Sequence, residues 1–220
     1  MSVFVKICGM TNEDDALLAV GMGADAVGFV FAPSPRQITP GKVADIVKRL
    51  PYEVLTVGVF RDQAPDLVAR TVHETGLRAA QLHGHETPAD AQWLASRVPV
   101  VICAFPAGDP ALEHVDDFGA DAILIDSPTP GSGEVFDWSL AEGAPVNRRL
   151  ILAGGLTPEN VAEAVRLVEP WGVDVSTGVE AAPGRKDPIK VQSFVRNAKA
   201  AEPPQYESVE GLPFNWQEDG

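Results

Sequence analysis

Eight short apolar runs alternate with segments of helical periodicity, and this alternation limits the possible folds more than any other feature of the chain. The runs are rich in β-branched residues and lie at 3–8, 25–31, 54–60, 79–83, 100–105, 122–126, 150–153 and 173–175. Helical periodicity is clearest at 15–20, 43–47 and 160–165, between these runs. Alternating strands and helices predict a parallel sheet covered by helices.

The junctions between these segments repeat, which indicates that one βα unit is reused along the chain. Three helices are expected to begin at the dipeptides Thr39-Pro40, Thr87-Pro88 and Thr157-Pro158. Thr caps a helix, and Pro fits its first turn without loss of a needed donor. Gly23-Ala24-Asp25-Ala26 and Gly119-Ala120-Asp121-Ala122 repeat a second junction, in which Gly ends one element before the next strand.

Eight such units without a Pro/Gly-rich linker before residue 200 predict an α/β fold, a single (β/α)₈ TIM barrel with a short C-terminal tail. We expect residues 1–200 to form the catalytic barrel domain and residues 201–220 a partly disordered extension, of which Tyr206, Phe214 and Trp216 favour some docking on the surface. An open doubly wound sheet is the alternative. Such a sheet requires a glycine-rich dinucleotide-binding fingerprint after the first strand. The residues at this place are Cys8-Gly9-Met10-Thr11, which do not match it.

The composition limits the partners of the chain. A formal net charge of −14 disfavours nucleic acid and anionic membrane surfaces, although loop N–H groups can still bind a small phosphorylated ligand. The two cysteines, Cys8 and Cys103, are too few for a disulfide framework and lack metal-ligand spacing, so we expect a cytoplasmic protein. Neither a signal peptide nor a membrane-spanning run is apparent, and the composition is compatible with a monomer or a homodimer.

Catalytic groups of such barrels lie at the C-terminal ends of the strands, which are polar here. Several motifs at these ends resemble, in family order, those of phosphoribosylanthranilate isomerases. They are Lys6-Ile7-Cys8-Gly9-Met10-Thr11, Gly28-Phe29-Val30-Phe31, Gln81-Leu82-His83-Gly84, Leu124-Ile125-Asp126, Gly133-Glu134-Val135-Phe136-Asp137-Trp138, Leu152-Ala153-Gly154-Gly155-Leu156 and Val173-Asp174-Val175-Ser176-Thr177-Gly178-Val179-Glu180. The resemblance covers about residues 3–200.

The resemblance implies an Amadori rearrangement of N-(5-phosphoribosyl)anthranilate in tryptophan biosynthesis, catalysed by an intramolecular oxidoreductase of the aldose–ketose type. It implies Cys8 as general base and Asp126 as general acid, with no metal or cofactor. Strand alternation puts Lys6 on the face of Cys8, where its charge favours thiolate, while an apolar neighbour such as Leu124 would keep Asp126 protonated. Without the resemblance, Cys8 reads as a small buried hydrophobe and Asp126 as a capping carboxylate.

Phosphate binding is expected at the loops after the last two strands, on Gly154, Gly155, Ser176, Thr177 and Gly178. The alternative is that these glycines only permit tight turns.

Arg36, His83 and Lys6 are the predicted substrate-binding side chains. By resemblance, Arg36 pairs with the anthranilate carboxylate; an exposed, solvated arginine is the alternative. His83 either lines the pocket or simply forms a hydrogen bond near Gln81. Asp174 is expected to face inward beside Lys6 and to orient it when the last strand pairs with the first.

Segment 127–133 contains two prolines and two glycines and is expected to close over the substrate.

Two other functions remain open. A dual-substrate isomerase would also accept the two-phosphate ribonucleotide of histidine biosynthesis and would need a second anion site, for which the first half of the chain offers Phe60-Arg61-Asp62 in place of a Gly-Gly pair. A non-catalytic phosphate-metabolite-binding barrel is the other.

Overall fold

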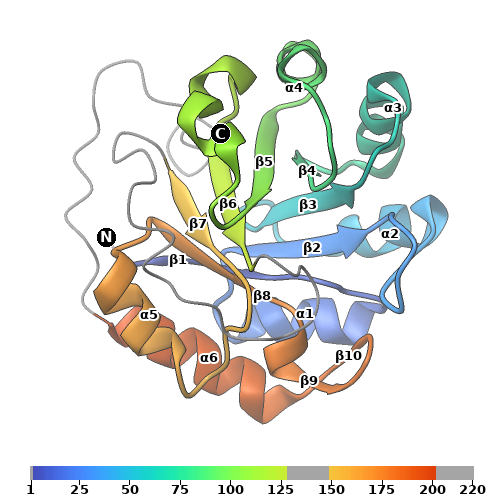
Figure 1. The fold of residues 1–220 in the computed structure, drawn as a ribbon. Coiled ribbons are helices and arrows are strands. Elements are labelled where there is room, and N and C mark those ends of the chain that lie inside the picture. The colour runs from blue at the N-terminus through green and yellow to red at the C-terminus, as the bar shows by residue number, and fades with distance from the viewer. Residues whose placement is uncertain (1, 128–148, 202–220) are drawn as a thin grey trace.

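The computed structural model describes residues 2–127 and 149–201 of the chain. Eight parallel strands pair in chain order and close into a barrel, in which β8 pairs with β1 (Figure 1). The strands are β1 (Phe4–Ile7), β2 (Ala26–Val30), β3 (Leu55–Phe60), β4 (Ala79–Leu82), β5 (Val100–Pro106), β6 (Ala122–Asp126), β7 (Leu150–Leu152) and β8 (Gly172–Val175). The predicted (β/α)₈ barrel is confirmed, and the open doubly wound sheet is excluded.

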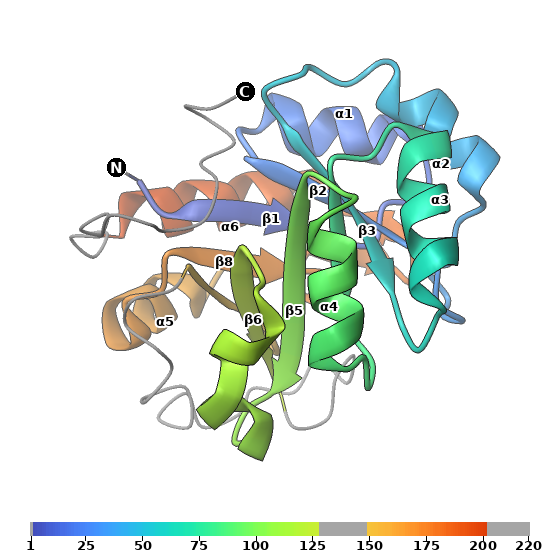
Figure 2. The same cartoon turned by 90° about the horizontal axis from the view of Figure 1, so that it is seen from above.

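Helical segments cover the outside of this barrel, as Figure 2 shows from above. They are α1 (Glu13–Gly21), α2 (Pro40–Val47), α3 (Pro65–Thr75), α4 (Pro88–Ala95), the 3₁₀ segment η1 (Pro110–Phe118), α5 (Val161–Val168) and α6 (Pro188–Ala200). After β8 the chain forms a short turn, η3 (Thr177–Val179), and a small antiparallel hairpin of β9 (Glu180–Ala182) and β10 (Arg185–Lys186). None of the described helices has the length and apolar character needed to cross a membrane.

The predicted helix starts and ends are confirmed in part. Thr87 caps α4 through a reciprocal capping box with Asp90, whereas Thr39 precedes α2 without a side-chain cap. Thr157 starts a turn, and α5 begins only at Val161, so this third helix start was placed too early. Gly119 takes the expected left-handed conformation, at the end of a 3₁₀ segment.

Strand alternation builds two apolar layers. Outward side chains such as Val5, Val173 and Phe29 pack beneath the helices, while inward ones such as Phe4, Leu55 and Leu124 fill the barrel. At the β1–β8 seam, the register sets Lys6 opposite Asp174, and both point inward. The barrel interior is therefore a packed core, and a cavity lies beyond the C-terminal ends of its strands.

Candidate active site

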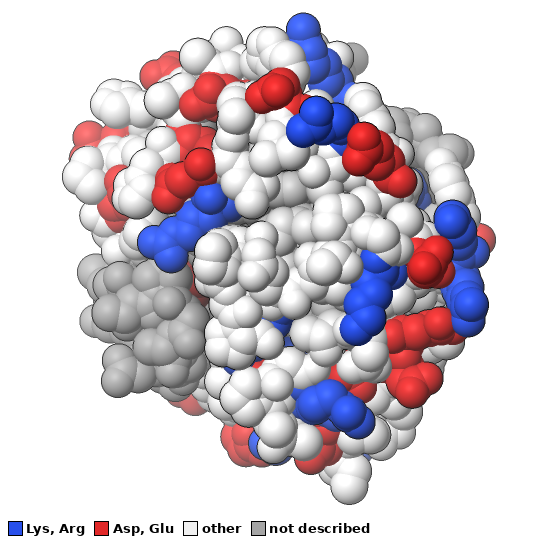
Figure 3. Space-filling view, turned by 90° about the vertical axis from the view of Figure 1, so that its right-hand side faces the viewer, with Lys and Arg blue, Asp and Glu red and all other residues white. Residues whose placement is uncertain are grey.

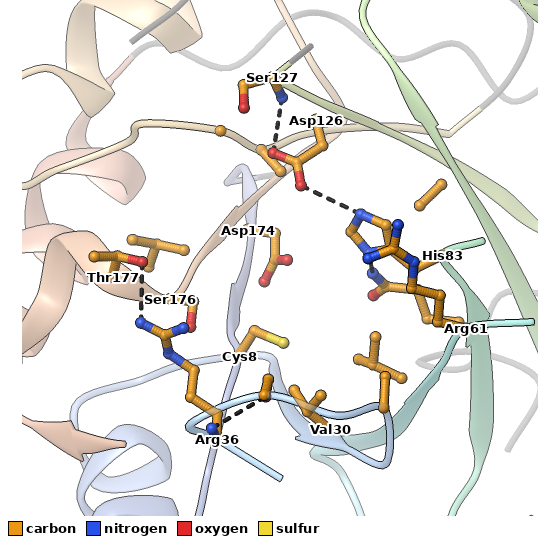
Figure 4. Close-up of a pocket in the computed structure, with 18 of the residues that line it drawn as sticks. Cys8, Val30, Arg36, Arg61, His83, Asp126, Ser127, Asp174, Ser176 and Thr177 are labelled. Carbon is orange, nitrogen blue, oxygen red and sulfur yellow. Dashed lines mark hydrogen bonds and ion pairs between the residues drawn. The ribbon is translucent and has the colours of Figure 1, made fainter. Parts of the chain in front are cut away.

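A cavity of about 360 Å³ lies at the C-terminal ends of the strands, a size suited to one small ligand. Nine of the ten predicted site residues line it: Cys8, Arg36, His83, Asp126, Gly154, Gly155, Ser176, Thr177 and Gly178. The tenth, Lys6, is completely buried below the cavity. Figure 4 shows Cys8, Asp126 and Asp174 around one cavity.

Cys8 follows the last residue of β1, and its backbone N–H donates to the carbonyl of Val175 on β8 at 2.8 Å. The residue is only 7% exposed. Gly28 on β2 makes room for the thiol, because a Cβ atom at this glycine would lie 2.7 Å from Sγ of Cys8. The sulfur is therefore held at the floor of the cavity by its neighbouring strands.

Lys6 and Asp174 form an ion pair beneath Cys8, with Nζ 3.0 Å from Oδ1. Burial alone lowers the pKa of Lys6, but the charges of Asp174 and Cys8 raise it above its ordinary value. The predicted inward orientation of Asp174 is confirmed. Lys6 does not line the cavity, because its ammonium is fully buried and paired with Asp174, and its direct contact with the substrate stays a prediction.

The protonation of Cys8 also departs from the sequence-based expectation. Burial raises the pKa of the thiol, and the charge of Asp174 acts in the same direction. Lys6 lowers this pKa as predicted, and Lys186 assists it, yet the net direction is upward. The thiol is thus the favoured form at neutral pH, because desolvation of a thiolate outweighs the nearby cations.

Asp126 ends β6 on the far side of the cavity, three strands from β1 around the barrel. Its Oδ1 accepts a hydrogen bond from the backbone N–H of Ser127 at 2.7 Å. Gly154 packs against this arrangement, since a Cβ atom there would lie 2.9 Å from Oδ1 of Asp126. The loop after β7 thereby helps to orient the carboxylate.

His83 extends beyond β4 toward the other oxygen of Asp126, with Nε2 3.2 Å from Oδ2 (Figure 4). This contact is a charge contact, and Nε2 of His83 forms no hydrogen bond among the described residues. Nδ1 of His83 lies 3.0 Å from Nε2 of the buried Gln81. If the Gln81 amide donates to Nδ1, the neutral imidazole carries its hydrogen on Nε2, on the side of Asp126.

The loops after β7 and β8 consist of small residues that allow a ligand to approach the backbone. Gly154 and Gly155 both have positive φ values, 82° and 64°. Gly178 cannot carry a side chain, because a Cβ atom there would collide with the carbonyl of Leu156. The first acidic residue is Glu159 in the loop after β7 and Glu180 in the loop after β8. Their backbone N–H groups therefore face little competition from carboxylates for a phosphate.

Arg36 reaches the cavity from the loop after β2, and its guanidinium binds Glu180 through two hydrogen bonds of 2.7 Å each. Nη2 also lies 3.2 Å from Oγ1 of Thr177. Gly9, with φ of 81°, lets the arginine pass, since a Cβ atom there would come within 2.7 Å of its Cδ. Lys186 on β10 donates to the same Glu180 at 3.2 Å.

Glu180 and Lys186 were not predicted as site residues. Glu180 closes the last motif of the sequence analysis, but 144 positions separate it from Arg36, and no local pattern pairs them. Only the closure of the barrel brings the two segments together.

Comparison with known proteins settles the family. A family model for N-(5'-phosphoribosyl)anthranilate (PRA) isomerase matches residues 5–197. The chain belongs to the PRA isomerase family. A PRA isomerase of Pelobacter propionicus is 46% identical over 201 residues, covering 89% of this chain and 95% of the relative.

Solved PRA isomerase structures share the fold. The enzyme from Thermus thermophilus superposes with a TM-score of 0.83 at 44% identity, covering 89% of this chain and 98% of that one. A second PRA isomerase structure, in complex with reduced 1-(o-carboxyphenylamino)-1-deoxyribulose 5-phosphate, has a TM-score of 0.79 at 43% identity and covers 90% and 98% of the two chains.

Two predictions about this PRA isomerase family member fall mainly on residues whose structure is not described. They are the closing segment 127–133, of which only Ser127 is described, and the extension 201–220, of which only Ala201 is described. On the face shown in Figure 3, the described Lys and Arg side chains are interspersed with Asp and Glu, with no continuous basic surface among them.

Proposed function

We propose that this protein isomerises N-(5'-phosphoribosyl)anthranilate to 1-(2-carboxyphenylamino)-1-deoxyribulose 5-phosphate in tryptophan biosynthesis. The observation that carries the proposal is that Cys8 and Asp126 line one cavity from β1 and β6, as two opposed proton-transfer groups must. Membership of the PRA isomerase family supplies the substrate.

The reaction needs two proton transfers. Asp126, as the acid, donates a proton to the ribose ring oxygen; the C1–O bond breaks, and the ring opens to a Schiff base between C1 and the anthranilate nitrogen. Cys8, as thiolate, then removes the proton from C2, and the electron pair moves to form an enolamine. Tautomerisation of the enolamine gives the ketone at C2. These steps need neither a metal nor a cofactor.

Two groups of residues hold the substrate in this proposal. The phosphate binds the loops after β7 and β8, at Gly154, Gly155, Ser176, Thr177 and Gly178. Arg36 binds the anthranilate carboxylate. Its Nε and Nη2 are already engaged by Glu180, so the substrate meets a guanidinium whose plane is set in advance.

His83 is the substrate contact beside Asp126. Its Nε2 lies 3.2 Å from Oδ2 of that residue. An N–H at Nε2 can therefore donate a hydrogen bond either to the Asp126 carboxylate or to a sugar hydroxyl that lies between His83 and Asp126. Lys6 acts on the substrate only through Cys8.

The direct test follows anthranilate fluorescence during turnover by the wild type and by Cys8→Ala and Asp126→Ala. Because each variant lacks one proton-transfer group, we expect kcat to fall at least about 100-fold in both. Cys103→Ala is the matched control, since that thiol is buried in strand β5 away from the cavity and should retain activity. A wild type without turnover would refute the proposed function, and an active Cys8→Ala would refute the base.

A cytoplasmic location fits this function. Cys8 and Cys103 are both free and buried, as expected where thiols are kept reduced and disulfides are rare. The proposed partner is a small phosphorylated molecule, and neither nucleic acid nor a membrane enters the reaction.

A further inference from the structure

Backbone N–H groups at one end of the cavity already have carboxylate partners. In a closed barrel of eight strands, β3 and β4 lie opposite β7 and β8. The proposed phosphate loops therefore face Arg61, Gly84 and His85, which line the cavity at the β3–β4 end. A ligand with phosphate groups at both of its ends would place the second one there.

At this end, the chain supplies its own anions. Glu86 accepts hydrogen bonds from the backbone N–H of Asp62 through Oε1 and of Gly84 through Oε2, both at 2.8 Å. Asp62 accepts one from the backbone N–H of His85 at 2.7 Å. Three N–H groups of two neighbouring loops are thus bound by two carboxylates.

The local backbone is shaped for this arrangement. Asp62 has a φ of 55°, a left-handed conformation that Asp and Asn adopt more readily than most residues. Gly84 packs against Asp62 so closely that a Cβ atom would lie 2.7 Å from the backbone nitrogen of Asp62. The hydrogen bond from the His85 backbone holds the pKa of the Asp62 carboxyl below its ordinary value, so this group remains an anion.

We propose that Glu86 and Asp62 occupy the anion-binding N–H groups at the β3–β4 end and so restrict the cavity to substrates with a single phosphate group. This inference rests on the proposed function, because it assumes that the first phosphate binds after β7 and β8.

The exclusion has a simple physical basis. A second phosphate would have to displace two carboxylates from their donors and would be repelled by both while it approached. The side chains of Arg61 and Asp62 are 63% and 49% exposed, and Nε of Arg61 lies 3.9 Å from Asp62. Solvent therefore weakens the charge effects of both, and the occupied N–H groups are the main obstacle to a second phosphate.

The test compares two ligands by calorimetry: ribulose 5-phosphate, with one phosphate, and the two-phosphate ribonucleotide substrate of the histidine-pathway isomerase. Glu86→Ala frees the N–H groups of Asp62 and Gly84, and Asp62→Asn removes the second charge while keeping a residue that tolerates positive φ. We expect the double variant to bind the two-phosphate ligand at least about tenfold more tightly than the wild type does, with its affinity for ribulose 5-phosphate unchanged.

Glu74→Ala on the exposed side of α3 is the matched control, because it also removes a carboxylate but lies outside the cavity. Glu86→Gln, which keeps the shape of the side chain, provides a milder variant if thermal unfolding shows that the double variant is damaged. It should show a smaller gain in the same direction.

The outcomes separate the two proposals. A wild type that binds ribulose 5-phosphate and turns over the anthranilate substrate, together with variants that gain nothing for the two-phosphate ligand, overturns the inference alone. Tight binding of the two-phosphate ligand by the wild type also overturns it. A wild type without turnover counts against the proposed function itself.

Discussion

At the scale of single residues, the two cysteines differ in role because their surroundings differ. Cys103 lies inside β5 and packs in the apolar layer beneath the helices, where burial raises the pKa of its thiol to about 12. Cys8 is also buried, yet Lys6 and Lys186 lower its pKa against the effect of burial. Only Cys8 faces the cavity, so only this thiol is available for catalysis.

The pH dependence of the reaction follows from Cys8. Because its pKa is raised in the free protein, the thiolate fraction grows as pH rises, and kcat/KM should increase from about pH 6.5 to beyond pH 9. Alkylation of the wild type by iodoacetamide should accelerate over the same range, with Cys103→Ala showing the same profile. A kcat/KM that stays flat across this range would contradict the assignment of Cys8 as a thiol in the free protein.

At the scale of elements, the loop after β2 and the β9–β10 hairpin meet above β1 through Arg36 and Glu180. Glu180 is 4% exposed at its side chain, and Lys186 adds a second cation from the same hairpin. Arg36, Lys186 and the backbone N–H of Gly184 all donate to this one carboxylate. The hairpin is therefore a brace that fixes the direction of Arg36.

This brace can be tested through substrate binding. Arg36→Lys loses the forked geometry and Glu180→Gln loses the charge that holds it, so both should raise KM about tenfold while kcat falls less than about threefold. Inhibition by ribulose 5-phosphate, which lacks the anthranilate ring, separates the possible contacts. If Arg36 binds the anthranilate carboxylate, this inhibition stays unchanged, whereas a weakened inhibition would assign Arg36 to the phosphate near Thr177.

At the scale of the whole molecule, the barrel closes where β8 pairs with β1, and the Lys6–Asp174 ion pair lies at this seam. Lys6 is completely buried, so its charge depends on the partner strand. The seam thus joins the first and last strands both through backbone pairing and through a charge pair beneath the active site.

Breaking the pair should destabilise the fold. Asp174→Asn leaves the Lys6 ammonium buried without its counter-charge, and we expect a loss of about 3 kcal/mol in the free energy of unfolding, measured with urea. The double variant Lys6→Met/Asp174→Asn removes the stranded charge and should recover most of this loss. Equal stability of the single variant and the wild type would show that the pair contributes little to closure.

The sequence by itself determined the architecture and the positions of the reacting groups. Strand and helix periods are local, so the eight apolar runs and the polar residues that follow them identify a barrel and its catalytic face. Cys8, Asp126 and the Gly154-Gly155 pair lie at strand ends, and that position alone brings them to one cavity.

Only the tertiary structure decided how these residues are tuned. The pairing of Arg36 with Glu180, the burial of Lys6 and the hydrogen bond that Glu86 accepts from the loop after β3 join segments whose spacing has no local period. The raised pKa of Cys8 likewise depends on the depth of burial and on charges from β8 and β10. Burial and long-range electrostatics arise only once the barrel has closed. The sequence predicts where these side chains lie, and the closed barrel sets their pKa values and their partners.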